Sequence, residues 1–147
     1  MTGQFSRCLA GLMLATTFSV SAVDIEQGHS GTWWVPGVDG QGVLLEVFPE
    51  SQKVFFTWYT YADGGKQRWL TGTGDISEQR ASFSIQEPVG AVFDKPGEPE
   101  RPVWGTGTLE FSSCTQATLT FQTDGAEGDG VLNLERLTPN VSCGGGS

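Results

Sequence analysis

The tryptophans and tyrosines are the residues of this sequence best suited to a function, and the function that they suit is binding. In Val54–Leu70, Trp58, Tyr59 and Tyr61 precede a tight polar turn and Trp69 follows it, a pattern that predicts a β-hairpin. Side chains alternate along a strand, so adjacent aromatics point to opposite faces and only one face can be core. Tryptophan and tyrosine offer a large contact area with a polar handle, which suits a ligand or a partner. We expect these ligand-binding residues: Trp33, Trp34, Gln41, Glu46, Trp58, Tyr59, Tyr61, Arg68, Trp69 and Trp104.

Two charged residues stand in apolar segments. Glu46 lies within Val43–Phe48 and Arg68 lies beside Trp69. If both point inward they must pair, because a lone buried charge costs several kcal/mol, and the pair would anchor a ligand. The alternative is that both point outward to solvent.

Catalysis is not expected. His29 is the only histidine and precedes the first strand, so no base is placed beside a nucleophile. A hydrolase that uses Glu46 is the least favoured alternative, because no second acid is singled out. The acidic turn Asp124–Asp129 lacks the alternating ligand pattern of an EF-hand loop. We therefore expect no catalytic residue, no metal and no cofactor.

The motifs resemble an uncharacterised bacterial exported domain family. The matching segments are Ser30–Pro36 (SGTWWVP), Gly40–Gly42 (GQG), Thr57–Tyr61 (TWYTY) and Arg68–Gly72 (RWLTG). This resemblance implies an exported single domain and no particular activity. Gly31-x-Trp33 is also faintly similar to the opening motif of avidin- and lipocalin-type barrels.

The candidate binding residues lie in or beside short segments in which apolar and polar residues alternate. Gly, Pro, Asp and Asn separate these segments. The segments predict an all-β fold, a single antiparallel up-and-down meander of about eight strands. Closure into a small barrel would remove the strand edges, and a β-sandwich is the alternative. The segment 88–102 is expected to be a surface excursion, with a lid as the alternative. The predicted strands are Gly31–Val35, Gly42–Phe48, Lys53–Tyr61, Gln67–Gly74, Ala81–Glu87, Val103–Phe111, Ala117–Thr123 and Gly130–Leu137.

The ends of the sequence predict export and a disulfide. Residues 1–22 read as a signal peptide, with cleavage near Ala22 and release to the periplasm or the medium. The domain then covers residues 23–138, with a tail at 139–147. In an oxidising compartment Cys114 and Cys143 should pair and tether that tail.

The bulk charge limits the partners. With 17 acidic and 8 basic residues the chain has a net charge of −9, so it should repel nucleic acid. No segment beyond the signal is expected to span a membrane. We expect an exported, non-catalytic module that binds a small apolar or sugar-like ligand or a protein partner. The alternative is a structural domain of the cell envelope that self-associates, for example as a homodimer.

Overall fold

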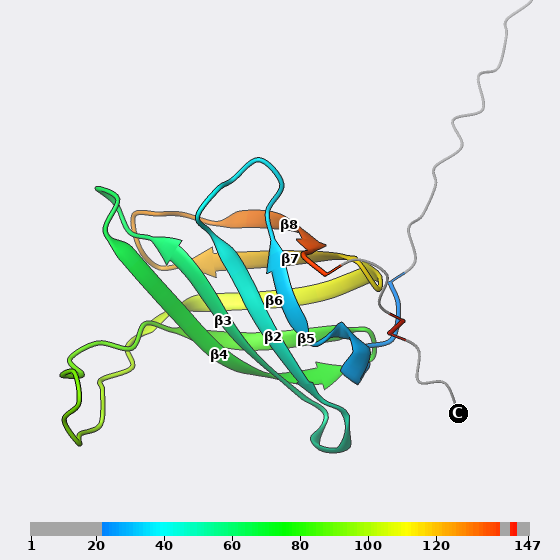
Figure 1. Ribbon diagram of the computed structural model, residues 1–147, viewed down its shortest axis with the longest axis horizontal. Helices are drawn as coiled ribbons and strands as arrows, with labels where there is room; N and C mark the ends of the chain where they lie inside the picture. Colours follow the sequence, from blue (N-terminus) through cyan, green and yellow to red (C-terminus); the bar gives the residue numbers. More distant parts are fainter. Residues whose placement is uncertain (1–21, 139–141, 144–147) are drawn as a thin grey trace, which may run out of the picture.

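The computed structural model describes residues 22–138, 142 and 143, and these form an eight-stranded antiparallel barrel. Neighbours in sequence are neighbours in the barrel, and β1 pairs with β8 to close it (Figure 1). The predicted all-β meander is confirmed, and the sandwich alternative is wrong. The strands are β1 (Gly31–Trp34), β2 (Gly42–Phe48), β3 (Lys53–Tyr61), β4 (Gln67–Ser77), β5 (Arg80–Gln86), β6 (Val103–Ser113), β7 (Gln116–Thr123) and β8 (Gly130–Arg136).

The predicted signal peptide lies outside the described residues except for Ala22, as does the predicted tail except for residues 142 and 143. Two short 3-10 turns, η1 (Gln27–His29) and η2 (Pro49–Ser51), complete the elements. No helix of the described residues is long and apolar enough to cross a membrane.

The interior is packed with apolar side chains from every strand. Alternation along β2, for example, buries Val43, Leu45 and Val47 and leaves the residues between them exposed. Inward glycines in β4 make room for large rings, since a Cβ at Gly74 would lie 2.6 Å from the Phe83 ring. The aromatic rings therefore fill the space that these glycines leave inside the barrel.

Residues 22–30 and Cys143 cover one end of the barrel, which we call the closed end. The Trp33 indole donates a hydrogen bond to the His29 carbonyl (3.1 Å), and the Arg136 guanidinium lies 5.6 Å from the Trp33 ring centre. Arg136 also donates from Nη1 to the Gly28 carbonyl (2.5 Å). The predicted disulfide Cys114–Cys143 is present at this end, with a Cα–Cα distance of 5.3 Å.

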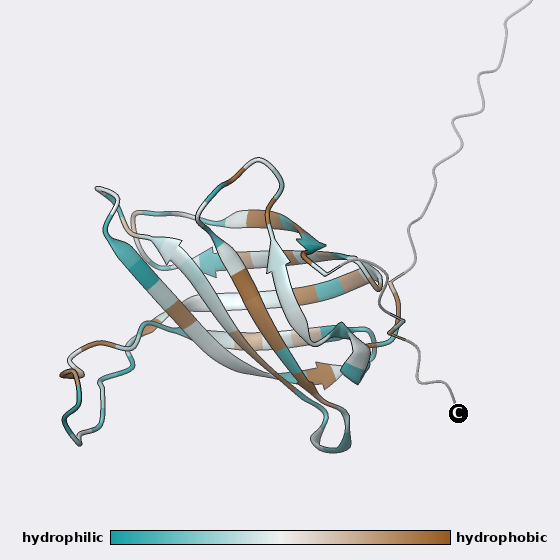
Figure 2. Cartoon of the chain, in the orientation of Figure 1, coloured by the Kyte–Doolittle hydropathy of each residue, from teal (hydrophilic) through white to brown (hydrophobic). Residues whose placement is uncertain are grey.

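The loops that follow β1, β3, β5 and β7 gather at the opposite end, which we call the mouth, because the strands alternate in direction. The longest of them, residues 87–102, projects from the barrel in Figure 1 and is called the arm. Figure 2 shows apolar colour on β2 and on part of the arm. The mouth and the outer surface beside it hold most of the predicted binding residues, but not Trp33 or Glu46.

Candidate functional site

A charged cluster covers the core at the mouth. The Arg68 side chain points inward and is only 12% exposed. Its Nε lies 3.1 Å from Glu87 Oε1, and its Nη1 lies 2.8 Å from Glu127 Oε1. Because Glu87 belongs to the arm and Glu127 to the β7–β8 loop, one guanidinium ties two loops across the barrel end.

An aromatic triad lies beneath this cluster. The ring centres of Trp58, Trp104 and Phe121 are 5.2 to 5.8 Å apart, and Trp58 and Trp104 meet edge to face. The Trp104 indole donates a 2.7 Å hydrogen bond to Glu127 Oε2. Desolvation of Glu127 opposes its ionisation, but the hydrogen bonds from Trp104 and Arg68 and the charge of Arg68 outweigh it and lower the pKa. Glu127 therefore stays ionised and holds the cluster together.

Glu46 and Arg68 do not pair, and the alternative in which both point outward holds for Glu46 but not for Arg68. Glu46 lies on the exposed side of β2, opposite Phe55 of β3. Arg68 shares the inward face of β4 with Leu70, so the two side chains lie on opposite faces of the wall.

A row of aromatic side chains crosses the outside of the barrel. Trp34 of β1, Gly42 of β2, Tyr59 of β3 and Trp69 of β4 stand directly opposite one another in register. Tyr59 is 51% and Trp69 is 52% exposed. Gly42 has no side chain, so it leaves a gap between Trp34 and Tyr59. We call Trp34, Tyr59 and Trp69 the outer aromatic row.

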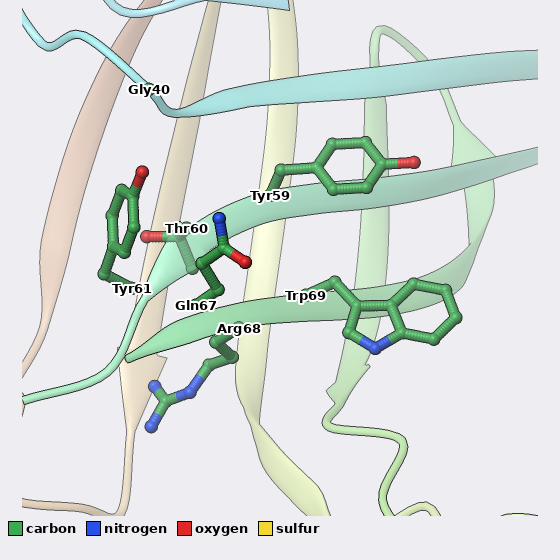
Figure 3. A pocket seen from close by; sticks show the side chains of 7 residues that line it. All are labelled: Gly40, Tyr59, Thr60, Tyr61, Gln67, Arg68 and Trp69. Atoms are coloured by element: carbon green, nitrogen blue, oxygen red, sulfur yellow. The ribbon is translucent and has the colours of Figure 1, made fainter. Parts of the chain in front are cut away.

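A pocket of about 300 Å³ lies where the outer aromatic row meets the rim of the mouth. Figure 3 shows the rings of Tyr59 and Trp69 extending from neighbouring strands in the same direction, while the Arg68 guanidinium points away from them. The Tyr61 ring packs so closely on the β1–β2 loop that a Cβ at Gly40 would lie 2.8 Å from its hydroxyl. We call this pocket of about 300 Å³ the rim pocket. It is lined by Gly40, Tyr59, Thr60, Tyr61, Gln67, Arg68 and Trp69.

The structure thus divides the predicted site residues into three groups. Tyr59, Tyr61, Arg68 and Trp69 come together at the rim pocket, with Trp34 farther along the row. Gln41 accepts a hydrogen bond from Thr60 (2.5 Å), which ties the β1–β2 loop to β3. The remaining residues are elsewhere: Trp33 is fully buried at the closed end, Trp58 and Trp104 pack in the triad, and Glu46 is exposed farther down β2.

Sequence reasoning missed Gln67, Glu87 and Glu127. Gln67 could have been found, because it precedes Arg68 and must face outward like Trp69. Glu87 ends the predicted strand Ala81–Glu87 on the same face as Phe83 and Ile85, so its direction could have been found. Glu127 lies in a loop, where no periodic pattern predicts orientation, and only the closure of the barrel brings it to Arg68.

No protein family, no curated protein and no solved structure matches this chain significantly. The resemblances noted from the motifs remain predictions.

Proposed function

We propose that this protein is an exported, non-catalytic module that binds a sugar-like ligand in the rim pocket. The carrying observation is the Tyr59–Trp69 pair, two exposed rings held side by side on paired strands. One face of a pyranose ring carries C–H groups that pack on such rings, and its hydroxyls need hydrogen-bond partners. The Gln67 amide and the Tyr61 hydroxyl line the same pocket and can supply them.

The mouth itself is a weaker candidate for the ligand. Arg68, Glu87, Glu127 and Trp104 already satisfy one another there. A ligand would have to break these charge-assisted hydrogen bonds to enter, at a cost of about 1.5–3 kcal/mol for each. The rim pocket needs no such rearrangement, so binding there keeps the barrel intact.

Titration of the chain with neutral trisaccharides, followed by tryptophan emission and calorimetry, tests the proposal. We expect saturable binding that Trp69→Ala weakens at least tenfold, because the variant removes one wall of the pocket. Phe48→Ala is the matched control, since Phe48 is 45% exposed but lies at the other end of β2. No saturable signal from any neutral or acidic trisaccharide at millimolar concentration would overturn the proposal.

Self-association is the second candidate, favoured by apolar side chains on the outer wall below the rim pocket. Leu44 is 41%, Phe48 45% and Phe55 37% exposed, all on β2 and β3. As a structural domain of the envelope, the protein would bury these residues against a second copy. Analytical ultracentrifugation tests this candidate. A chain that sediments only as a monomer at micromolar concentration would exclude it.

A further inference from the structure

A second hollow of about 540 Å³ lies next to the rim pocket, between the outer wall of the barrel and the arm. Its volume is in the range of small-ligand sites. The barrel side is formed by Phe55, Trp69 and Thr71. We call the whole hollow the arm groove. Its arm side is formed by Pro88, Val89, Gly90, Ala91, Pro99 and Arg101.

The arm side of the groove is held by its own backbone. Val89 and Glu100 exchange two hydrogen bonds of 2.9 Å, and the Glu87 amide donates to the Pro102 carbonyl (3.0 Å). Pro88 and Pro99 further restrict the backbone torsion angles beside these bonds. The groove is therefore formed before a ligand arrives, which lowers the entropic cost of binding.

Arg101 is the one charged residue of a lining that otherwise consists of apolar residues, glycine and Thr71. In the part of the chain that the structure describes, Lys53, Arg68 and Arg80 form ion pairs. No ion pair is formed by Arg101 among the same residues. A guanidinium binds a carboxylate through two parallel hydrogen bonds, so the groove is complementary to an apolar or ring-shaped group that carries one carboxylate.

Trp69 joins the arm groove to the rim pocket, because its side chain lines both. The side chains of Gln67, Trp69 and Thr71, which are every second residue of β4, all lie on its outer side. At about 3.3 Å per residue, Gln67 and Thr71 are roughly 13 Å apart, so one extended ligand can contact both hollows.

We propose that the arm groove is a subsite for a carboxylate-bearing sugar residue of the ligand held in the rim pocket, with Arg101 binding the carboxylate. This inference rests on the proposed function. The strong negative charge of the chain makes a polyanionic saccharide a poor ligand, because exposed charges interact over about 8 Å at physiological ionic strength. The ligand is therefore a largely neutral oligosaccharide with a single acidic residue.

The test compares matched pairs of trisaccharides by calorimetry. Each pair consists of a neutral trisaccharide of glucose, galactose or mannose and the same molecule with its terminal residue oxidised to the uronic acid. For at least one pair we expect the acidic member to bind about tenfold more tightly at low salt, and added salt to reduce the difference. Arg101→Gln should abolish the preference, so that the two members of each pair bind with equal affinity.

Controls separate this inference from the proposed function. Lys95→Gln removes another unpaired cation of the arm, outside the groove lining, and should change nothing. Equal affinity for both members of every pair, or a preference that survives Arg101→Gln, overturns the acidic subsite and leaves the proposed function standing. Binding of decanoate that depends on Arg101, without binding of any trisaccharide, overturns both.

Discussion

At the scale of single residues, neighbouring side chains of similar chemistry have opposite roles. Trp33 is fully buried and hydrogen-bonded to the His29 carbonyl, while Trp34 stands on the outer wall. Trp58 packs in the aromatic triad, while Tyr59 lines the rim pocket. The alternation of side chains along a strand makes this division, so it was predictable once the strands were recognised.

His29 is a residue-scale determinant of pH-dependent stability. The imidazole is buried beside Phe111, with ring centres 4.2 Å apart. Desolvation by burial lowers its pKa, and this outweighs the opposing effects of the Glu26 backbone hydrogen bond and carboxylate; the charge of Arg136 also lowers it. Below its ordinary pKa of about 6.5 the unfolded chain binds a proton that the folded chain resists. The free energy of unfolding should therefore fall as the pH drops from 7.5 to 5.5.

Urea unfolding of an untagged chain at several pH values measures this effect. His29 is the only histidine, so His29→Gln should lower stability at pH 7.5 but remove most of the slope between pH 7.5 and 5.5. Carboxylates titrate mainly at lower pH and should give both chains the same further loss. An unchanged slope in the variant would contradict the assignment to His29.

At the scale of elements, β3 and β4 show why the fold was more predictable than the site. The run of apolar and aromatic residues in Lys53–Tyr61 indicated a strand, and the structure confirms it. The contact of Arg68 with Glu127 could not be predicted, because Glu127 lies in a loop without periodicity and reaches Arg68 only in the closed barrel. Glu87, by contrast, ends a predicted strand that pairs with β4. The arm groove was also unpredictable, since it depends on how the arm packs beside Phe55 and Trp69.

The inward glycines of β4 give an element-scale prediction. A Cβ at Gly74 would lie 2.6 Å from both the Phe83 ring and the Ser82 carbonyl oxygen. Because the carbonyl is part of the paired β5 strand, it cannot move away freely, so Gly74→Ala should destabilise the fold by about 1–3 kcal/mol. Gly97→Ala in the arm is the control, because no atom lies within 4 Å of its added Cβ. Equal stability of the two variants in urea would show that β4 can adjust without cost.

At the scale of the whole molecule, the barrel separates stability from binding. The closed end holds the disulfide and the contacts of Arg136, whereas the mouth holds the rim pocket and the arm. Closure removes most of the strand edges through which a partner could pair with the backbone. Recognition therefore depends on outward side chains, which agrees with a site built from Tyr59 and Trp69.

The disulfide tests this separation. Cys114 and Cys143 are 29 residues apart, so cross-linking them restricts the unfolded chain by about 3.5 kcal/mol in the loop-entropy estimate. Cys143 also packs closely against the N-terminal segment, because a Cβ at Gly28 would lie 2.3 Å from the Cys143 Cα. Cys143→Ser should therefore lower the free energy of unfolding by about 2–4 kcal/mol. Reduction of the parent chain should cause a similar loss, and reductant should not affect the variant.

Binding should respond differently, because the disulfide and the rim pocket lie at opposite ends of the barrel. Under conditions where Cys143→Ser remains folded, its affinity for a trisaccharide should equal that of the parent chain, as measured by calorimetry. Trp69→Ala should show the reverse pattern, with weakened binding and a change in stability under about 1 kcal/mol, since half of its side chain is already exposed to water. A Cys143→Ser chain that is folded but has lost affinity would show that the termini shape the mouth through the barrel wall.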